Sequence, residues 1–548
     1  MTPPLDLNAS TGNIMPSMGS FRVDWYGKPV GCLTIRAPGE YEWTILDPAL
    51  NALFPQSRFA KGMPATVFNL HPDLGMFGEL LNITTKAEYI ERGMRALSNI
   101  SFHPTGEHET IKPQFNGTTP ILDVHGAALA NEKDPVLDSF HGTYAGPVGM
   151  AGTEEFNAML KRQWIGRFSH RFSGKQTKLP MNLQGSILVP ALGRLSFTHF
   201  AKYPTVGGRE SDGLLEWMGL RQARDLGMEV NDFALVDQGR DYAPLLAVER
   251  FDIPKKPGDT DEPWVLLQDF YSILGQDPAN DATTDHRLFR YDDLVAGFID
   301  YSRKNLPATP DKEDRIYINA QAVLKRIFLA WASNDGDLHA KNFSTLIYVD
   351  PKTKKITDVR FAPVYDSCPS VFSGKDGGSM YYNLRIPKGR GAIYEGKPAN
   401  TLNMNSFIDF LDNPRISVGG KRYCIFDTRA EAETFIRDIA AKVAQSAVDS
   451  LHSIPPFVHD LKHAPMLIFD AQMAAAIAVE RARKIGAKTP DYPFDPDIYK
   501  KNKEFGARAR HSALGGEEGN RRGLYSQLSE KILAQLRPVI PGLRNNPT

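Results

Sequence analysis

One polar segment constrains the fold of this chain more than any other part of its sequence. Residues 334–343 are Asn-Asp-Gly-Asp-Leu-His-Ala-Lys-Asn-Phe, and they directly follow an apolar stripe with helical spacing from Gln321 to Trp331. A segment this polar cannot itself be core, and its Gly336 predicts a tight loop. The sequence therefore places a polar loop at the end of a buried helix, although an ordinary Asx-rich turn would have a similar composition.

A predicted β-hairpin follows this loop. Residues 345–349 and 356–361 have strand-like composition, and the turn sequence Asp-Pro-Lys-Thr-Lys separates them. Because a hairpin returns the chain to its starting point, Asn342 before it and Asp366 after it can approach one another. Protein kinases use an Asp to orient the substrate hydroxyl, and an Asn and a second Asp to hold Mg²⁺, which prefers oxygen ligands. The spacing therefore predicts phosphoryl transfer, with Asp337 as the catalytic residue and Asn342 and Asp366 as metal ligands.

Lys202 and Glu216 are candidates for a charged pair. Lys202 ends a strand-like run that begins at Leu195, and a helix predicted over 213–226 carries Glu216 near its start. A lysine beside apolar neighbours on a strand needs a partner, and kinases use such a pair to hold the ATP phosphates. A merely solvated lysine at a strand end is the alternative interpretation.

A loop upstream of Lys202 is the candidate phosphate cover. Residues 172–179 lie where a kinase places this loop, and they supply Gly174, Gln176 and Lys178 as candidate nucleotide contacts. Their single glycine is a weak version of a phosphate-binding loop, so the position carries more information than the composition.

The run 245–252 resembles a buried strand that turns polar at its end. A hinge between two lobes would lie there, so Glu249 and Phe251 are candidates for contact with adenine. An ordinary strand end would have the same pattern.

Composition sets the broader limits. The chain has 548 residues, more than one hydrophobic core normally organises, and 64 Lys plus Arg balance 64 Asp plus Glu. No net field would draw it to nucleic acid or an anionic membrane, so any DNA contact must be local or made through a partner. Three widely spaced cysteines and the lack of an apolar run near the roughly 20 residues of a membrane span predict a cytoplasmic protein.

The predicted organisation is an α+β fold in four parts. Two lobes, one rich in β-strands and one mostly helical, would enclose a cleft, and Thr428 and Glu431 form a capping-box pattern in the helical lobe. The expected parts are a small α+β module with an irregular connector (1–150), the β-rich lobe (151–263), the helical lobe with the polar loop (264–500) and a tail (501–548).

These features together resemble the HipA family of kinase toxins. The matching strings are Val67-Phe-Asn-Leu70, Ser173-Gly-Lys-Gln-Thr-Lys178, Phe200-Ala-Lys-Tyr-Pro204, Ala247-Val-Glu-Arg-Phe-Asp252, Gly336-Asp-Leu-His-Ala-Lys-Asn-Phe-Ser344 and Tyr365-Asp366. The resemblance implies a two-lobed protein-kinase-like fold with a small N-terminal subdomain. It also implies ATP- and Mg²⁺-dependent phosphorylation of a protein serine or threonine, in known members often on an aminoacyl-tRNA synthetase.

The resemblance implies the same roles for the central residues. Asp337 would be catalytic, Asn342 and Asp366 would bind Mg²⁺, and Lys202 would bind phosphate. The further residues implied to lie near the nucleotide are Glu249, Phe251, His339 and Lys341.

Family members commonly pair with a small helix-turn-helix antitoxin, so the implied contact with DNA is indirect. One departure concerns regulation: many members carry an autophosphorylated serine where this chain has Arg171, and the nearest candidates are Ser169, Ser173 and Thr177. The chain is also longer than expected for the family, mainly at about 85–150 and in its tail.

Three other functions stay open from the sequence. A small-molecule kinase of the antibiotic-phosphotransferase type would share the site, and a non-catalytic co-repressor subunit would have no ATP turnover. A metallohydrolase built on Asp335, Asp337 and His339 would favour Zn²⁺ or Mn²⁺ and would need no nucleotide.

Overall fold

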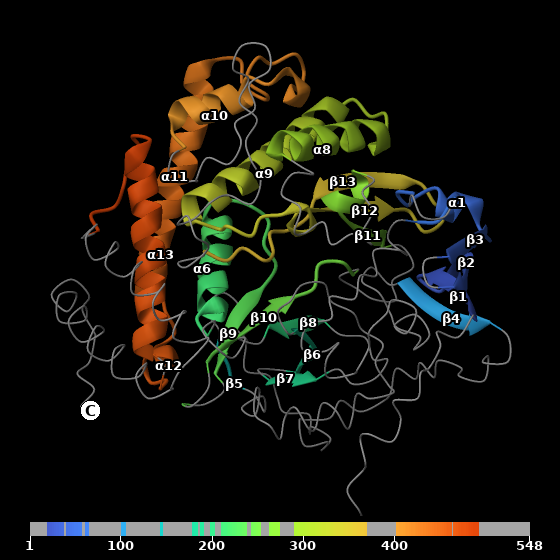
Figure 1. Ribbon diagram of the computed structural model, residues 1–548, viewed down its shortest axis with the longest axis horizontal. Helices are drawn as coiled ribbons and strands as arrows, with labels where there is room; N and C mark the ends of the chain where they lie inside the picture. The colour runs from blue at the N-terminus through green and yellow to red at the C-terminus, as the bar shows by residue number, and fades with distance from the viewer. Residues whose placement is uncertain are drawn as a thin grey trace, which may run out of the picture.

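In the described residues, the computed structural model (Figure 1) has three β-sheets, and most helices lie to the left of these sheets or above them in this view. It describes residues 19–37, 40–56, 61–64, 100–105, 143–145, 178–184, 187–190, 198–202, 210–237, 240, 243–253, 262–274, 290–369, 402–462 and 464–492.

The N-terminal sheet is antiparallel and has the strand order β3-β2-β1-β4. The turn between the first two strands contains only Tyr26 and Gly27, whose φ angles of 50° and 71° match the twist of a two-residue hairpin. The elements are β1 (Gly19–Trp25), β2 (Lys28–Ala37), β3 (Glu40–Ile45), the short helix α1 (Pro48–Asn51) and β4 (Ile100–Thr105).

A second, three-stranded sheet carries the predicted hairpin. Its order is β11-β12-β13, with β11 (Trp264–Asp269), β12 (Ser344–Val349) and β13 (Ile356–Phe361). The last two strands pair antiparallel, which confirms the hairpin expected from the sequence.

Tyr26 joins the N-terminal sheet to this three-stranded sheet. Its hydroxyl donates to the Val265 carbonyl at 3.2 Å and accepts from the Val265 N–H at 3.0 Å. Its ring stacks on Trp264 at 5.3 Å between centroids, and Trp25 packs against both rings. A bulky residue with positive φ is uncommon, and here the turn aims the tyrosine at the edge strand β11.

Replacing Tyr26 with phenylalanine should therefore lower the free energy of unfolding by about 1–3 kcal/mol, because the hydroxyl satisfies two backbone groups of a buried residue. The amide of Val265 should exchange its hydrogen faster in the variant, which hydrogen exchange read by mass spectrometry of the β11 peptide can measure. Unchanged exchange at β11 would contradict the contact.

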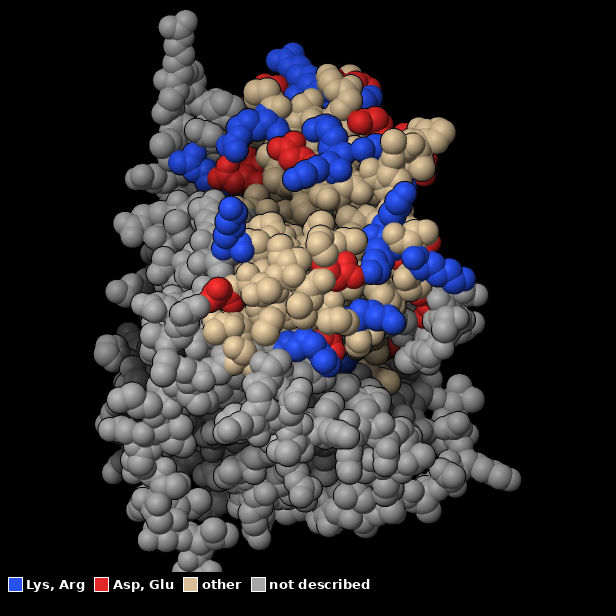
Figure 2. Space-filling model, turned by 90° about the vertical axis from the view of Figure 1, so that its right-hand side faces the viewer, with Lys and Arg blue, Asp and Glu red and all other residues tan. Residues whose placement is uncertain are grey.

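Figure 2 shows the face of the molecule that includes this N-terminal region. Lys and Arg side chains lie among Asp and Glu side chains over the described part of this face, without a field of one sign. Among the described helices, none combines the length and the apolar character that crossing a membrane requires.

The third sheet has six strands in the order β5-β9-β10-β8-β6-β7. Only the β5–β9 pair is parallel. β5 lies before the lobe boundary expected at 151, so this sheet recruits a segment that was assigned to the irregular connector. The elements are β5 (Thr143–Ala145), β6 (Lys178–Gln184), β7 (Ile187–Pro190), β8 (His199–Lys202), helix α6 (Asp212–Asp225), β9 (Phe233–Asp237) and β10 (Leu245–Glu249).

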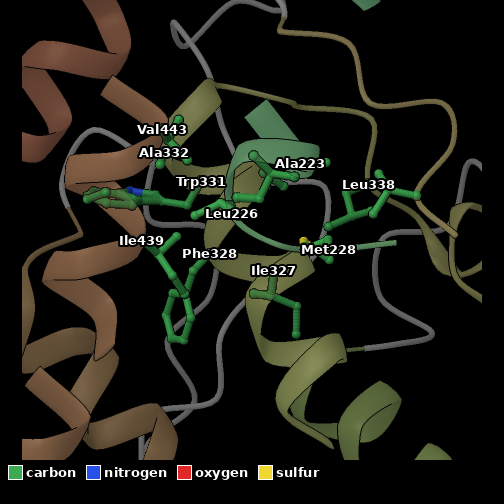
Figure 3. Packing of buried hydrophobic residues seen from close by; sticks show 14 of the residues in the cluster. Ala223, Leu226, Met228, Ile327, Phe328, Trp331, Ala332, Leu338, Ile439 and Val443 are labelled. Carbon is green, nitrogen blue, oxygen red and sulfur yellow. The ribbon is translucent and has the colours of Figure 1, made fainter. Parts of the chain in front are cut away.

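The helices pack around α9, and this core extends to the polar loop. Figure 3 shows Phe328 and Trp331 of α9 beside Ile439 and Val443 of α11, with Leu338 of the loop in the same cluster. The helices are α7 (Phe270–Ile273), α8 (Tyr291–Asn305), α9 (Lys312–Ser333), the 3-10 turn η2 (Ala340–Asn342), α10 (Met404–Leu411), η4 (Pro414–Ile416), α11 (Arg429–His452), α12 (Pro456–His459) and α13 (Ala464–Lys484).

The start of α11 confirms one half of the predicted capping box: Thr428 caps the helix, but the Glu431 carboxylate accepts from the Asp427 N–H at 3.1 Å rather than from the Thr428 N–H. The Glu431 N–H donates to Thr428 Oγ1 at 3.2 Å, which satisfies one of the backbone donors left open at a helix N-terminus.

Candidate active site

The polar loop is fixed to the core at both of its ends. α9 stops at Ser333 because Asn334 takes the left-handed conformation, with φ 66°. Leu338 is completely buried, and its carbonyl accepts a hydrogen bond from the Tyr291 hydroxyl at 3.1 Å. Between these anchors Asp337 is exposed, so the loop presents an acidic residue on a rigid backbone.

Asn342 is bonded to the same loop. Its Nδ2 donates to the Asp337 carbonyl at 2.8 Å. Because an amide carries its oxygen opposite the nitrogen, this bond turns Oδ1 away from the Asp337 backbone. The chain then runs through β12 and β13 and reaches Asp366, whose φ of 47° marks a sharp local turn.

Lys202 of β8 lies between two carboxylates. It is 1% exposed, and its Nζ donates to Glu216 of α6 and to Asp366. Burial alone would lower the pKa of this lysine, but the two carboxylates reverse the effect and raise the pKa well above its usual value. Lys202 is therefore a cation, and the predicted Lys202–Glu216 pair is confirmed as a contact.

Arg326 and Asp335 connect the loop to Asp366. Arg326 lies on α9 and is 1% exposed; it donates to Asp335 Oδ2 at 2.9 Å and to the Asp366 carbonyl at 3.4 Å. Asp335 Oδ1 in turn accepts from the Asp337 N–H at 3.2 Å. One buried ion pair thus fixes the backbones of both Asp337 and Asp366. Arg326 does not stand out in the sequence, because α9 carries other charged residues such as Arg315 and Lys325.

The role of Asp335 argues against the metallohydrolase alternative. Burial raises the pKa of this carboxyl, which the Arg326 guanidinium opposes, and its two oxygens are engaged by Arg326 and the Asp337 N–H. Within the described ranges, no group of three His, Cys, Asp or Glu side chains is placed to hold a metal ion.

Of the two predicted hinge residues, Phe251 packs against Tyr365, the residue before Asp366. The Phe251 ring is 5.6 Å from the Tyr365 ring, and it packs partly buried on a small cluster of Val265, Leu346 and Ala362. Glu249 closes β10, where its N–H donates to the Asp232 carbonyl at 2.8 Å. Phe251 therefore contributes an apolar ring beside Tyr365, and the adenine contacts of Glu249 and Phe251 stay predictions.

The remaining predicted residues fall into three groups. His339 and Lys341 belong to the loop itself: the Asn342 N–H donates to the His339 carbonyl at 2.8 Å, and Lys341 Nζ lies 5.7 Å from the Tyr271 ring centroid. Lys178 begins β6 with its backbone opposite Lys202. Residues outside the described ranges are Gly174, Gln176, Arg171, Ser169, Ser173, Thr177 and the string Val67–Leu70.

The donor set fits a hard divalent cation with a nucleotide. Asn342 and Asp366 offer an amide and a carboxylate oxygen, and the side chain of Asp366 is 25% exposed, so it is open to a ligand. Two protein oxygens suffice for Mg²⁺, which usually takes water and phosphate oxygens as its other ligands.

A known protein family and solved structures are similar to this chain. The sequence model described as "HipA-like C-terminal domain" matches residues 171–449, slightly more than half of the chain. HipA of Shewanella oneidensis MR-1, solved with HipB and operator DNA, is 16% identical with a TM-score of 0.55, over 88% of this chain and 99% of that chain. This likeness confirms the predicted fold class, a protein-kinase-like α+β fold of the HipA type.

A second solved structure is more distant. The Helicobacter pylori proinflammatory kinase CtkA is 15% identical, with a TM-score of 0.29 over 52% of this chain and 87% of that chain. No curated protein matches the sequence.

Proposed function

The chain belongs to the HipA family, and on that basis we propose that it is a kinase that transfers the γ-phosphate of ATP to a serine or threonine hydroxyl of a protein. We propose further that it acts as the toxin of a toxin-antitoxin pair.

The observation that carries this proposal is the arrangement of Lys202, Glu216 and Asp366. Desolvation makes a buried lysine cation costly, and here two carboxylates keep Lys202 charged. One of them, Asp366, is connected through Arg326 and Asp335 to the loop that carries the exposed Asp337. Kinase catalysis needs such a cation for the phosphates and an acid for the substrate hydroxyl.

The residues would divide the chemistry as follows. Glu216 holds Lys202 in place, and Lys202 neutralises charge on the ATP phosphates. Asp337 orients the substrate hydroxyl and accepts its proton as the oxygen attacks the γ-phosphorus in line. The bond from the γ-phosphorus to the β,γ-bridging oxygen breaks, and ADP leaves with that oxygen. Asn342 and Asp366 would hold Mg²⁺, which when bound supplies positive charge against the charge on the phosphates.

The substrate and the partner are proposed by class. The similar Shewanella protein was solved with HipB and operator DNA, so we propose a small DNA-binding antitoxin as partner, with DNA contacted through it. The proposed target is a protein, with an aminoacyl-tRNA synthetase as the class to test first.

Incubation with γ-labelled ATP, Mg²⁺ and host extract tests the proposal. We expect a discrete labelled protein band that disappears when EDTA removes the metal. Label only in a small molecule would favour the antibiotic-phosphotransferase type. The absence of any ATP turnover, with antitoxin-dependent DNA binding retained, would favour the co-repressor alternative.

A further inference from the structure

Gly219 of α6 faces the segment that follows Asp366. A Cβ atom at this position would lie 1.9 Å from the Ser367 carbonyl oxygen, 2.8 Å from the Ser367 carbonyl carbon and 3.0 Å from Pro369 Cδ. The first two are backbone atoms, so they cannot rotate aside as a side chain could. The helix and this segment approach each other as closely as they do only because residue 219 lacks a side chain.

Gly219 also shares a helix face with the charged pair. It lies three residues after Glu216, and residues with this spacing are neighbours on a helix surface. Glu216 contacts Lys202, and Lys202 contacts Asp366 immediately before Ser367. The distance between α6 and the segment 367–369 therefore sets whether both carboxylates can reach the same lysine.

The other sides of α6 are held by the helical lobe. Ser446 of α11 donates to Asp225 at 2.5 Å, and Arg221 donates to Ser453 Oγ at 3.2 Å. At the helix start, the Ser211 hydroxyl donates to the buried Asp470 of α13. Buried apolar side chains of α6 belong to the same core as α9, α11 and α13. α6 therefore cannot simply move away from a new side chain at position 219.

We propose that Gly219 is a positioning residue, which fixes α6 between the segment after Asp366 and the helical lobe and so keeps the Lys202 ion pairs assembled. In this arrangement the Lys202–Glu216 contact is part of the packed core, and it does not depend on a swing of α6. The catalytic consequence of this inference rests on the proposed kinase function, whereas its structural consequence does not.

Gly219→Ala tests the inference, with Gly297→Ala as the matched control. Both glycines lie inside helices, but a Cβ at Gly297 would meet mainly Cδ2 of Leu274, the far end of a flexible side chain. Alanine is the better helix former by about 1 kcal/mol, so without a clash each variant should be at least as stable as the parent. We expect this for Gly297→Ala, and a loss of stability for Gly219→Ala.

Thiol labelling gives a readout that is independent of kinase activity. Cys368 lies in the segment 367–369, which a side chain at position 219 would displace, and its sulfur is 3.9 Å from the Asp212 carbonyl. Cys424 is fully buried elsewhere. In a Cys32→Ser background, Cys368 should react with a thiol reagent several-fold faster in Gly219→Ala than in the parent. The labelling rate of Cys424 should be the same in both. Phosphoryl transfer should fall on the order of 10²-fold, because a small misplacement of reacting groups is enough for such a loss.

A second variant covers the case in which Gly219→Ala folds poorly. Adding Ser446→Ala removes one of the contacts that hold α6 to α11, so the double variant should regain part of the stability and slow the labelling of Cys368. Parent-like stability and labelling in Gly219→Ala, or no recovery in the double variant, would overturn the inference. If the labelling behaves as expected but the parent transfers no phosphate, only the proposed function fails.

Discussion

Replacing Asp337 with alanine should lower the rate of phosphoryl transfer by on the order of 10² to 10³ while the fold stays intact. Asp337 is exposed, so its loss removes no core contact, and the loop backbone stays anchored through Leu338 and Asn342. The loss should fall on kcat, because the carboxylate acts on the hydroxyl in the transition state and contributes little to ATP binding.

The matched control is Asp300→Ala. Asp300 lies on α8, its side chain is 78% exposed, and it forms a surface ion pair with Arg303. We expect parent-like transfer and stability for this variant. The measurement is the initial rate of label transfer at saturating ATP, with thermal unfolding as the check on folding. Transfer by Asp337→Ala at the rate of Asp300→Ala would show that Asp337 is not catalytic.

The second large effect is expected at Arg326. Arg326→Met leaves the buried Asp335 carboxylate without its cation, and breaking a buried pair in this way typically costs about 3–5 kcal/mol. Transfer should fall as well, because the Asp337 backbone and the Asp366 backbone lose the ion pair that fixes them both.

The cost of Arg326→Met should depend on pH in a defined direction. Burial already raises the pKa of Asp335, and removal of the guanidinium takes away the strongest opposing effect. A carboxyl with a raised pKa in the folded state contributes stability below its unfolded pKa of about 4, and this contribution is lost as the pH rises. The variant should therefore be closest to the parent in stability near pH 4 and furthest from it at neutral pH.

A double variant separates stability from positioning. Arg326→Met with Asp335→Asn removes the uncompensated charge, so most of the free energy of unfolding should return. Transfer should stay low, since a neutral pair does not reproduce the connection to Asp366. Denaturant unfolding and initial rates measure the two effects. If the double variant regains both, the ion pair has only a structural role.

Several features of the site could be predicted from the sequence because each depends on residues that are close together in the chain. The polar loop after an apolar helix, the hairpin and the capping pattern at Thr428 depend on spacing within a few residues. The Lys202–Glu216 pair could be predicted because a strand and the next helix supply its partners. The family and the fold class were also predicted correctly, since the loop string is specific.

Other features depend on contacts between segments far apart in the chain, and no local sequence pattern predicts them. Arg481 of α13 donates to the Trp331 carbonyl and to Asn334 at the start of the loop, about 150 positions away. Gly219 looks like an ordinary helix glycine until the segment after Asp366 packs against it. The roles of the site residues and the boundaries between the four parts stay predictions.

We propose that Asn342 and Asp366 hold one metal ion beside a lysine that binds phosphate. A crystal structure with Mg²⁺ and a non-hydrolysable ATP analogue tests it most directly. We predict a single Mg²⁺ bound by oxygens of both residues and of the nucleotide, with Lys202 on the phosphates, Glu216 still its partner, and Asp337 facing the γ-phosphate. A nucleotide bound elsewhere, or a metal ion without Asp366 among its ligands, would rule out this site.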